Sequence, residues 1–133
     1  MDASVCAKWF LDEEHSDKAR QVRDSFVTGT LSITVPSLIY YETLNALRYS
    51  GLFAERELGS AALSLSKYGF DVWEPRGEVY RETARVSLRN DISIYDASYI
   101  ALSDYLHVPF YTADGEIVDK FPRTAHHVKN FKE

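Results

Sequence analysis

Short runs of β-branched and aromatic residues alternate with longer segments of helical spacing, and this alternation constrains the fold more than any other feature. The runs LSITV (31–35), FDVWEP (70–75) and VPFYTA (108–113) have the composition of strands, and HHVKNF (126–131) is a candidate for a last one. Parallel strands need long crossover connections, which are usually helices. The alternation therefore predicts an α/β domain built on a parallel sheet.

The segments between these runs carry helix signals at their ends. After Ser16, which is placed to cap a helix, apolar residues recur at amphipathic spacing. Pro36 suits the first turn of the next helix, and Gly51 is placed to end it. The expected helices span residues 16–26, 36–50, 54–68, 77–89 and 94–106.

Composition narrows the class of protein. With 133 residues, 45% of them hydrophobic and 26% charged, the chain fits an ordered globular domain. No apolar run approaches the ~20 residues that span a membrane, and the N-terminus lacks the features of a signal peptide. The single cysteine, Cys6, excludes an internal disulfide and a cysteine-based zinc cluster. We therefore expect a cytoplasmic protein with no membrane partner.

The net charge of −5 argues against a simple nucleic-acid-binding module, because such modules usually present an excess of basic residues. It does not argue against a nuclease. The carboxylates that bind metal ions in a nuclease themselves make the total charge more negative.

Three isolated acids occupy comparable positions in the predicted fold. Asp114 follows the run PFYTA directly, Asp96 lies in the first turn of the helix 94–106, and Asp2 stands at the end of whatever first strand exists. In a parallel α/β sheet the carboxyl ends of strands and the N-termini of helices gather at one edge, where ligands bind. The three acids are therefore expected to meet there.

A fourth acid, Glu42, lies well inside its helix. It shares a line with Leu38, Asn45 and Tyr49, spaced at i, i+4, i+7 and i+11. Glu42 and Asn45 would then be a polar pair on an otherwise apolar stripe, and buried polar groups need partners.

Carboxylates that are brought together cannot all stay ionised without a counter-charge. Divalent cations supply one, and Mg²⁺ prefers oxygen ligands while keeping waters that leave room for a phosphate. Two such ions ~4 Å apart would stabilise both the attacking and the leaving oxygen of phosphodiester hydrolysis.

Three segments together resemble the PIN-domain family, and within it the VapC-type toxin ribonucleases. These segments are MDASVCAKWFLDEE, VPSLIYYETLNALR and SIYDASYIALSDYLHVPFYTAD. The resemblance covers essentially the whole chain and implies one PIN-like domain at residues 1–133. It implies a doubly wound parallel α/β fold of about four or five strands flanked by helices. It also implies cleavage of RNA with Mg²⁺ or Mn²⁺, a small antitoxin partner that offers arginine to the acids, and a homodimer.

The resemblance also assigns roles within the site. The acids of the catalytic metal centre would be Asp2, Glu42, Asp96 and Asp114. Glu42 would act either as a ligand or by positioning a water, and the other three as direct ligands. Residues that flank the centre would be Ser4, Asn45 and Thr112. RNA-binding residues stay unassigned.

Each acid has an ordinary explanation when it is taken alone. Asp96 suits the first turn of a helix because of the helix dipole, and Asp114 before Gly115 suits a turn. Asp2 could be an exposed terminal residue, and Glu42 a surface acid. Four such coincidences in the family's order are improbable.

Other polar groups favour surface roles. His126 and His127 are adjacent, so they would face opposite sides of a strand. The stripe of Arg81, Arg85 and Arg89 runs beside acids of the same helix, which indicates a solvated, salt-bridged face.

The start of the chain departs from the family pattern, in which several apolar residues form a central strand before the first acid. Here only Met1 precedes Asp2. We expect either a chain that begins upstream or a shorter first strand through ASVCA. Two non-enzymatic alternatives stay open: a PIN domain that binds an antitoxin or RNA without cutting, and, less favoured, a receiver-like signalling domain.

Overall fold

The computed structural model describes residues 1–132, and within them four short strands pair two by two. Strand β1 (Thr34–Val35) runs parallel to β2 (Asp71–Val72), and β3 (Phe110–Thr112) runs parallel to β4 (Ala125–His127). The parallel pairing and the α/β class agree with the sequence. The strands form two separate pairs within the described residues, however, and not one continuous sheet.

An apolar groove of about 500 Å³ is lined by residues from one strand of each pair. Ile33 and Thr34 line it at the start of β1, and Phe110 and Tyr111 line it from β3. Within residues 1–132, β1 and β3 belong to separate pairs and are not hydrogen-bonded to each other.

The expected first strand through ASVCA is wrong, because these residues form helix α1 (Ala3–Ala7). Asp2 caps this helix by accepting hydrogen bonds from the backbone N–H groups of Ser4 and Val5. Val5 is β-branched and therefore favours strands, but the Asp2 cap and the burial of the helix against the core outweigh that preference.

Five helices match the expected segments closely: α2 (Ser16–Val27), α3 (Leu38–Tyr49), α4 (Glu55–Lys67), α5 (Glu78–Asn90) and α6 (Ile94–Leu106). A further short helix, α7 (Gly115–Lys120), was not among the expected segments. Gly51 follows α3 with a φ of 75°, as expected for a residue that ends a helix. The segment HHVKNF is strand only at its start, because Val128–Asn130 form the 3₁₀ helix η1.

Two predicted helix starts are wrong in detail. The N-cap of α2 is His15, in a left-handed conformation with φ 65°, and Ser16 is the first helical residue. The Ser16 hydroxyl instead donates to the Leu11 carbonyl and accepts from the Glu13 N–H, so it fixes the preceding loop. Pro36 lies before α3, where its carbonyl accepts from the N–H of Ile39.

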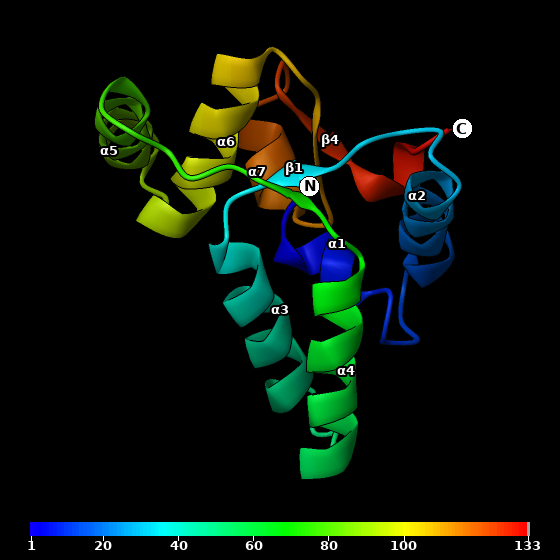
Figure 1. The fold of residues 1–133 in the computed structure, drawn as a ribbon. Helices are drawn as coiled ribbons and strands as arrows, with labels where there is room; N and C mark the ends of the chain where they lie inside the picture. Colours follow the sequence, from blue (N-terminus) through cyan, green and yellow to red (C-terminus); the bar gives the residue numbers. More distant parts are fainter. Residues whose placement is uncertain (133) are drawn as a thin grey trace.

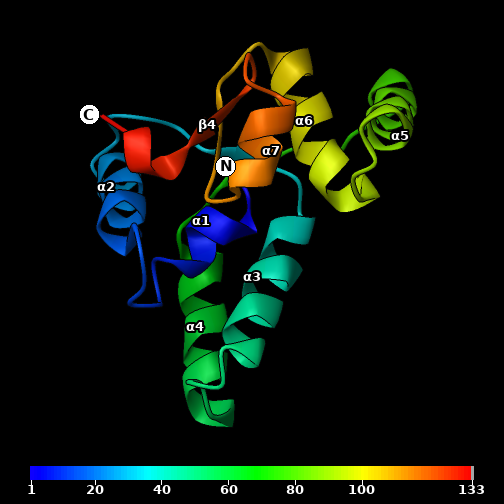
Figure 2. The same cartoon turned by 180° about the vertical axis from the view of Figure 1, so that it is seen from behind.

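The helices surround the strands on several sides. Helices α3 and α4 lie side by side and project away from the strands, whereas α5 and α6 pack together at the other end (Figure 1; Figure 2). The core beneath the strands contains fully buried residues from α1, β1, α3, α6 and η1: Val5, Val35, Ile39, Ile100 and Val128. Burying each of these side chains stabilises the fold by about 1.5–3 kcal/mol relative to leaving it exposed. This packing holds in place the helices and strands that carry the acids.

Helix α6 is buried from Ala97 through Ser103, all around its axis. This explains why the run after Asp96 is almost entirely apolar or small. None of the described helices is both long enough and apolar enough to cross a membrane.

Candidate active site

Asp2 is held by donors from two elements. Its Oδ1 accepts from the Ser4 hydroxyl at 2.6 Å and from the N–H groups of Ser4 and Val5 at 3.0 and 3.3 Å. Its Oδ2 accepts from the Thr112 hydroxyl at 2.6 Å. Asp2 is half-buried, and desolvation raises the pKa of its carboxyl although the hydrogen bonds act in the opposite direction.

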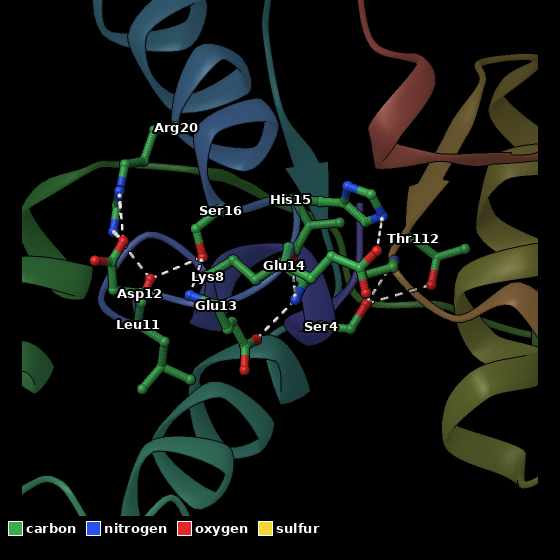
Figure 3. Close-up of polar contacts among 12 residues, drawn as sticks. Ser4, Lys8, Leu11, Asp12, Glu13, Glu14, His15, Ser16, Arg20 and Thr112 are labelled. Carbon is green, nitrogen blue, oxygen red and sulfur yellow. Dashed lines mark hydrogen bonds and ion pairs between the residues drawn. The ribbon is translucent and has the colours of Figure 1, made fainter.

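Ser4 and Thr112 join α1 to β3. They point toward one another, with 3.3 Å between their hydroxyl oxygens (Figure 3). The Ser4 hydroxyl accepts from the N–H of Ala113 at 2.8 Å, and the Thr112 hydroxyl accepts from the N–H of Asp114 at 3.0 Å. Both predicted hydroxyl residues therefore lie against Asp2, and Thr112 connects Asp2 with the backbone of Asp114.

Asp114 is exposed and caps α7. Its Oδ1 accepts from the N–H groups of Glu116 and Ile117 at 2.8 and 3.4 Å. The carboxylate thus follows β3 directly and stands at the helix N-terminus, where negative charge is favoured.

Glu42 and Asp96 complete the set of acids. Glu42 is half-buried on α3, and its Oε1 accepts from the Tyr99 hydroxyl at 2.7 Å. Burial raises the pKa of Glu42, and the negative charges of Asp2 and Asp96 raise it further. Asp96 is half-buried in the first turn of α6, and its carboxylate accepts no hydrogen bond from residues 1–132. The charges of Asp2 and Asp96 therefore both act on Glu42, although the three residues belong to different elements.

Asn45 does not join this group. The buried residues of α3 are Ile39, Thr43 and Leu47, one position away from the expected stripe. Asn45 is exposed, and Tyr49 is 73% exposed. The expected buried Glu42–Asn45 pair is therefore wrong, because the helix is rotated relative to the predicted line.

Tyr99, whose hydroxyl contacts Glu42, was not identified from the sequence. It lies three residues after Asp96 on α6, and residues at that spacing share a helix face. Burial and the Glu42 carboxylate both raise the pKa of Tyr99, so its hydroxyl stays a proton donor. The i, i+3 spacing of Asp96 and Tyr99 was the available signal. An aromatic residue in an apolar run is, however, first interpreted as a core residue.

The other polar candidates take surface roles. Arg81 pairs with Glu78 at 2.6 Å and Arg85 pairs with Glu82, both on exposed faces of α5. His126 lies against the ring of Tyr111, whereas His127 packs against the ring of His15. The loop between α1 and α2 is likewise tied by ion pairs, including Lys8 with Glu13 (Figure 3).

The acids provide the oxygen ligands that Mg²⁺ and Mn²⁺ prefer. Burial is the main cause of the raised pKa of Glu42, and the charges of Asp2 and Asp96 add to it; a divalent cation would offset that added negative charge. Within residues 1–132, however, no three His, Cys, Asp or Glu side chains are grouped closely enough to hold a metal ion. The donor chemistry fits a hard cation, and the metal centre stays a prediction.

Comparisons with known proteins agree with the resemblance seen in the sequence. The family model described as PIN domain matches residues 1–125. Ribonuclease VapC3 of Pyrobaculum aerophilum is 27% identical over 127 residues, which cover 92% of this chain and 93% of that protein. The crystal structure of PAE2754 from Pyrobaculum aerophilum superposes with a TM-score of 0.65 at 27% identity, covering 96% of this chain and 87% of that one.

Proposed function

Since this chain belongs to the PIN-domain family, we propose that it is a divalent-metal-dependent endoribonuclease and the toxin of a toxin–antitoxin pair. The observation that supports the proposal is that Asp2 and Asp96, from two other elements, lie near enough to Glu42 for their charges to raise its pKa, while Thr112 joins Asp2 to the backbone of Asp114. Similarity to Ribonuclease VapC3 supports RNA as the substrate.

In this proposal Asp2, Asp96 and Asp114 would hold Mg²⁺ or Mn²⁺, with Glu42 as a further ligand or as the group that orients water. The cation, when bound, supplies an activated water and offsets negative charge on the phosphate. The chain's own contribution is to fix the acids. Ser4 and Thr112 donate to both oxygens of Asp2, which orients that carboxylate before any ligand arrives.

The site is open toward solvent on one side. Asp114 is exposed, and Asp96 and Glu42 are half-buried, so a phosphodiester of a single strand can approach them. Desolvation raises the pKa of Asp2, and the lower local dielectric there strengthens electrostatic interactions.

The test is cleavage of a mixed single-stranded RNA in Mg²⁺, in Mn²⁺ and in EDTA. The variant is Asp96→Asn, which keeps the shape and removes the charge, and the matched control is Asp17→Asn, an exposed acid on α2. We expect EDTA to abolish cleavage and Asp96→Asn to reduce it about a hundredfold, with the control unchanged. Cleavage that survives EDTA, or an Asp96→Asn enzyme as active as wild type, contradicts the proposal.

A second candidate is a PIN domain that binds RNA or an antitoxin without cutting. It is favoured by one observation, that no three metal-binding side chains in residues 1–132 are grouped closely enough to hold a metal ion. A folded wild type that retains RNA in a filter-binding assay but releases no fragments in Mn²⁺ would select this candidate. The family model for the PIN domain matches residues 1–125, which argues against the alternative of a receiver-like signalling domain.

The partner in the proposal is a small antitoxin that presents arginine to the acids, since a bidentate arginine–carboxylate contact would block a cation from the same oxygens. The homodimer is proposed on the same family grounds. Light scattering gives the molar mass of the purified chain alone, which tests the homodimer. The same measurement on the chain with a co-expressed antitoxin tests that complex.

A further inference from the structure

Glu42 reaches the acid group through one specific contact. The Tyr99 hydroxyl donates to Oε1 of Glu42 at 2.7 Å and so connects α3 with α6. In the described residues this is the hydrogen bond that holds the Glu42 carboxylate, and its other oxygen, Oε2, accepts none.

Tyr99 is itself rigid. Its side chain is 4% exposed, and its ring stacks on Phe110 of β3 with centroids 5.8 Å apart and an interplanar angle of 22°. It lies on α6 three residues after Asp96, so the same helix that presents Asp96 also presents the donor to Glu42. A buried, stacked ring leaves its hydroxyl little freedom to move.

Glu42 needs such a restraint because other acids lie near it. Asp2 and Asp96 are near enough to act electrostatically on its carboxylate, and like charges repel. Glu42 is half-buried, with solvent within reach of a flexible side chain. Without a donor, repulsion and hydration would both favour a rotamer that turns the carboxylate away from the two aspartates.

We propose that Tyr99 is a positioning residue of the nuclease site, whose hydroxyl holds the Glu42 carboxylate beside Asp2 and Asp96. The inference rests on the proposed metal-dependent function and adds a residue to it. Tyr99 acts through Glu42 and does not itself contact substrate.

The test is Tyr99→Phe, which keeps the ring and its stacking on Phe110 and removes only the hydroxyl. The matched control is Tyr105→Phe, the same change on the same helix at a position that is 57% exposed. We expect Tyr99→Phe to lower kcat about tenfold and to weaken Mn²⁺ binding, measured by calorimetry, by about the same factor. KM for RNA should stay within about twofold, and the control should behave as wild type.

A second experiment, in the Glu42→Ala variant, distinguishes a positioning role of Tyr99 from a purely structural one. In Glu42→Ala the carboxylate is absent, so adding Tyr99→Phe should cause no further loss of Mn²⁺ affinity. An additional loss there overturns the proposal, and so does a Tyr99→Phe protein with unchanged kcat and Mn²⁺ affinity. A Tyr99→Phe chain that fails to fold by circular dichroism also overturns it, because the role would then be structural. A wild type that neither cuts RNA nor binds Mn²⁺ refutes the proposed function instead.

Discussion

The Thr112 hydroxyl donates to Oδ2 of Asp2 at 2.6 Å, between residues that are 110 positions apart in sequence. The same hydroxyl accepts from the N–H of Asp114. One fully buried side chain at the end of β3 therefore positions the first acid and the backbone of the last. The placement of these acids thus depends on strand β3 as well as on the acids' own elements.

Thr112→Val should destabilise the fold by about 1–3 kcal/mol, because the variant leaves one oxygen of a desolvated carboxylate without its donor. The substitution keeps the branched shape, so packing around the buried position is retained. Urea unfolding at neutral pH measures the loss. Thr30→Val, at an exposed position, is the matched control and should change little. Equal free energies of unfolding for the two variants would show that the hydrogen bond from Thr112 to Asp2 does not stabilise the fold.

Glu42→Gln should stabilise the metal-free protein at neutral pH, and the gain should disappear on acidification. The pKa of Glu42 is raised in the folded state, so ionisation costs stability above that folded pKa. Below the unfolded value of about 4.3 the carboxyl is protonated in both states and the cost is absent. The glutamine still offers an oxygen to Tyr99. Urea unfolding of both proteins across pH 4–8 with EDTA checks the trend, and a gain that is constant with pH would refute it.

Cys6 should be unreactive in the folded protein. It is fully buried on α1, and burial raises its pKa to about 12, so almost no thiolate is present near neutral pH. A thiol reagent at about pH 8 should label it only in denaturant. Rapid labelling of the native chain would mean that α1 opens locally.

Features with local signals were well predicted from the sequence. Helix α6 spans residues 94–106 as expected, because Ser93 caps its N-terminus by accepting from the N–H of Asp96. Asp114 comes shortly after β3 and Asp96 lies in the first turn of α6, as expected from the order of strands and helices.

Features that depend on competition between elements were not predictable in the same way. ASVCA suits a strand by composition, but the carboxylate of Asp2 caps these residues into a helix. Asn45 was misplaced because the buried line of α3 begins at Ile39, and sequence spacing alone does not choose between neighbouring lines. The Tyr99–Glu42 contact joins residues 57 positions apart, so no local pattern could show that it forms.

Mn²⁺ should raise the thermal stability of the wild-type protein, and EDTA should reverse the effect. A ligand that binds only the folded state stabilises it by about 2.7 kcal/mol at a hundred times its Kd. A cation should stabilise the folded protein because it would offset both the burial of the Glu42 carboxylate, which is the main cause of its raised pKa, and the added charges of Asp2 and Asp96. Asp96→Asn should lose most of the Mn²⁺-dependent shift in Tm, whereas Asp17→Asn should keep it. Since the measurement needs no RNA, a shift that is the same in wild type and Asp96→Asn would place the cation elsewhere on the protein, whatever the nuclease assay shows.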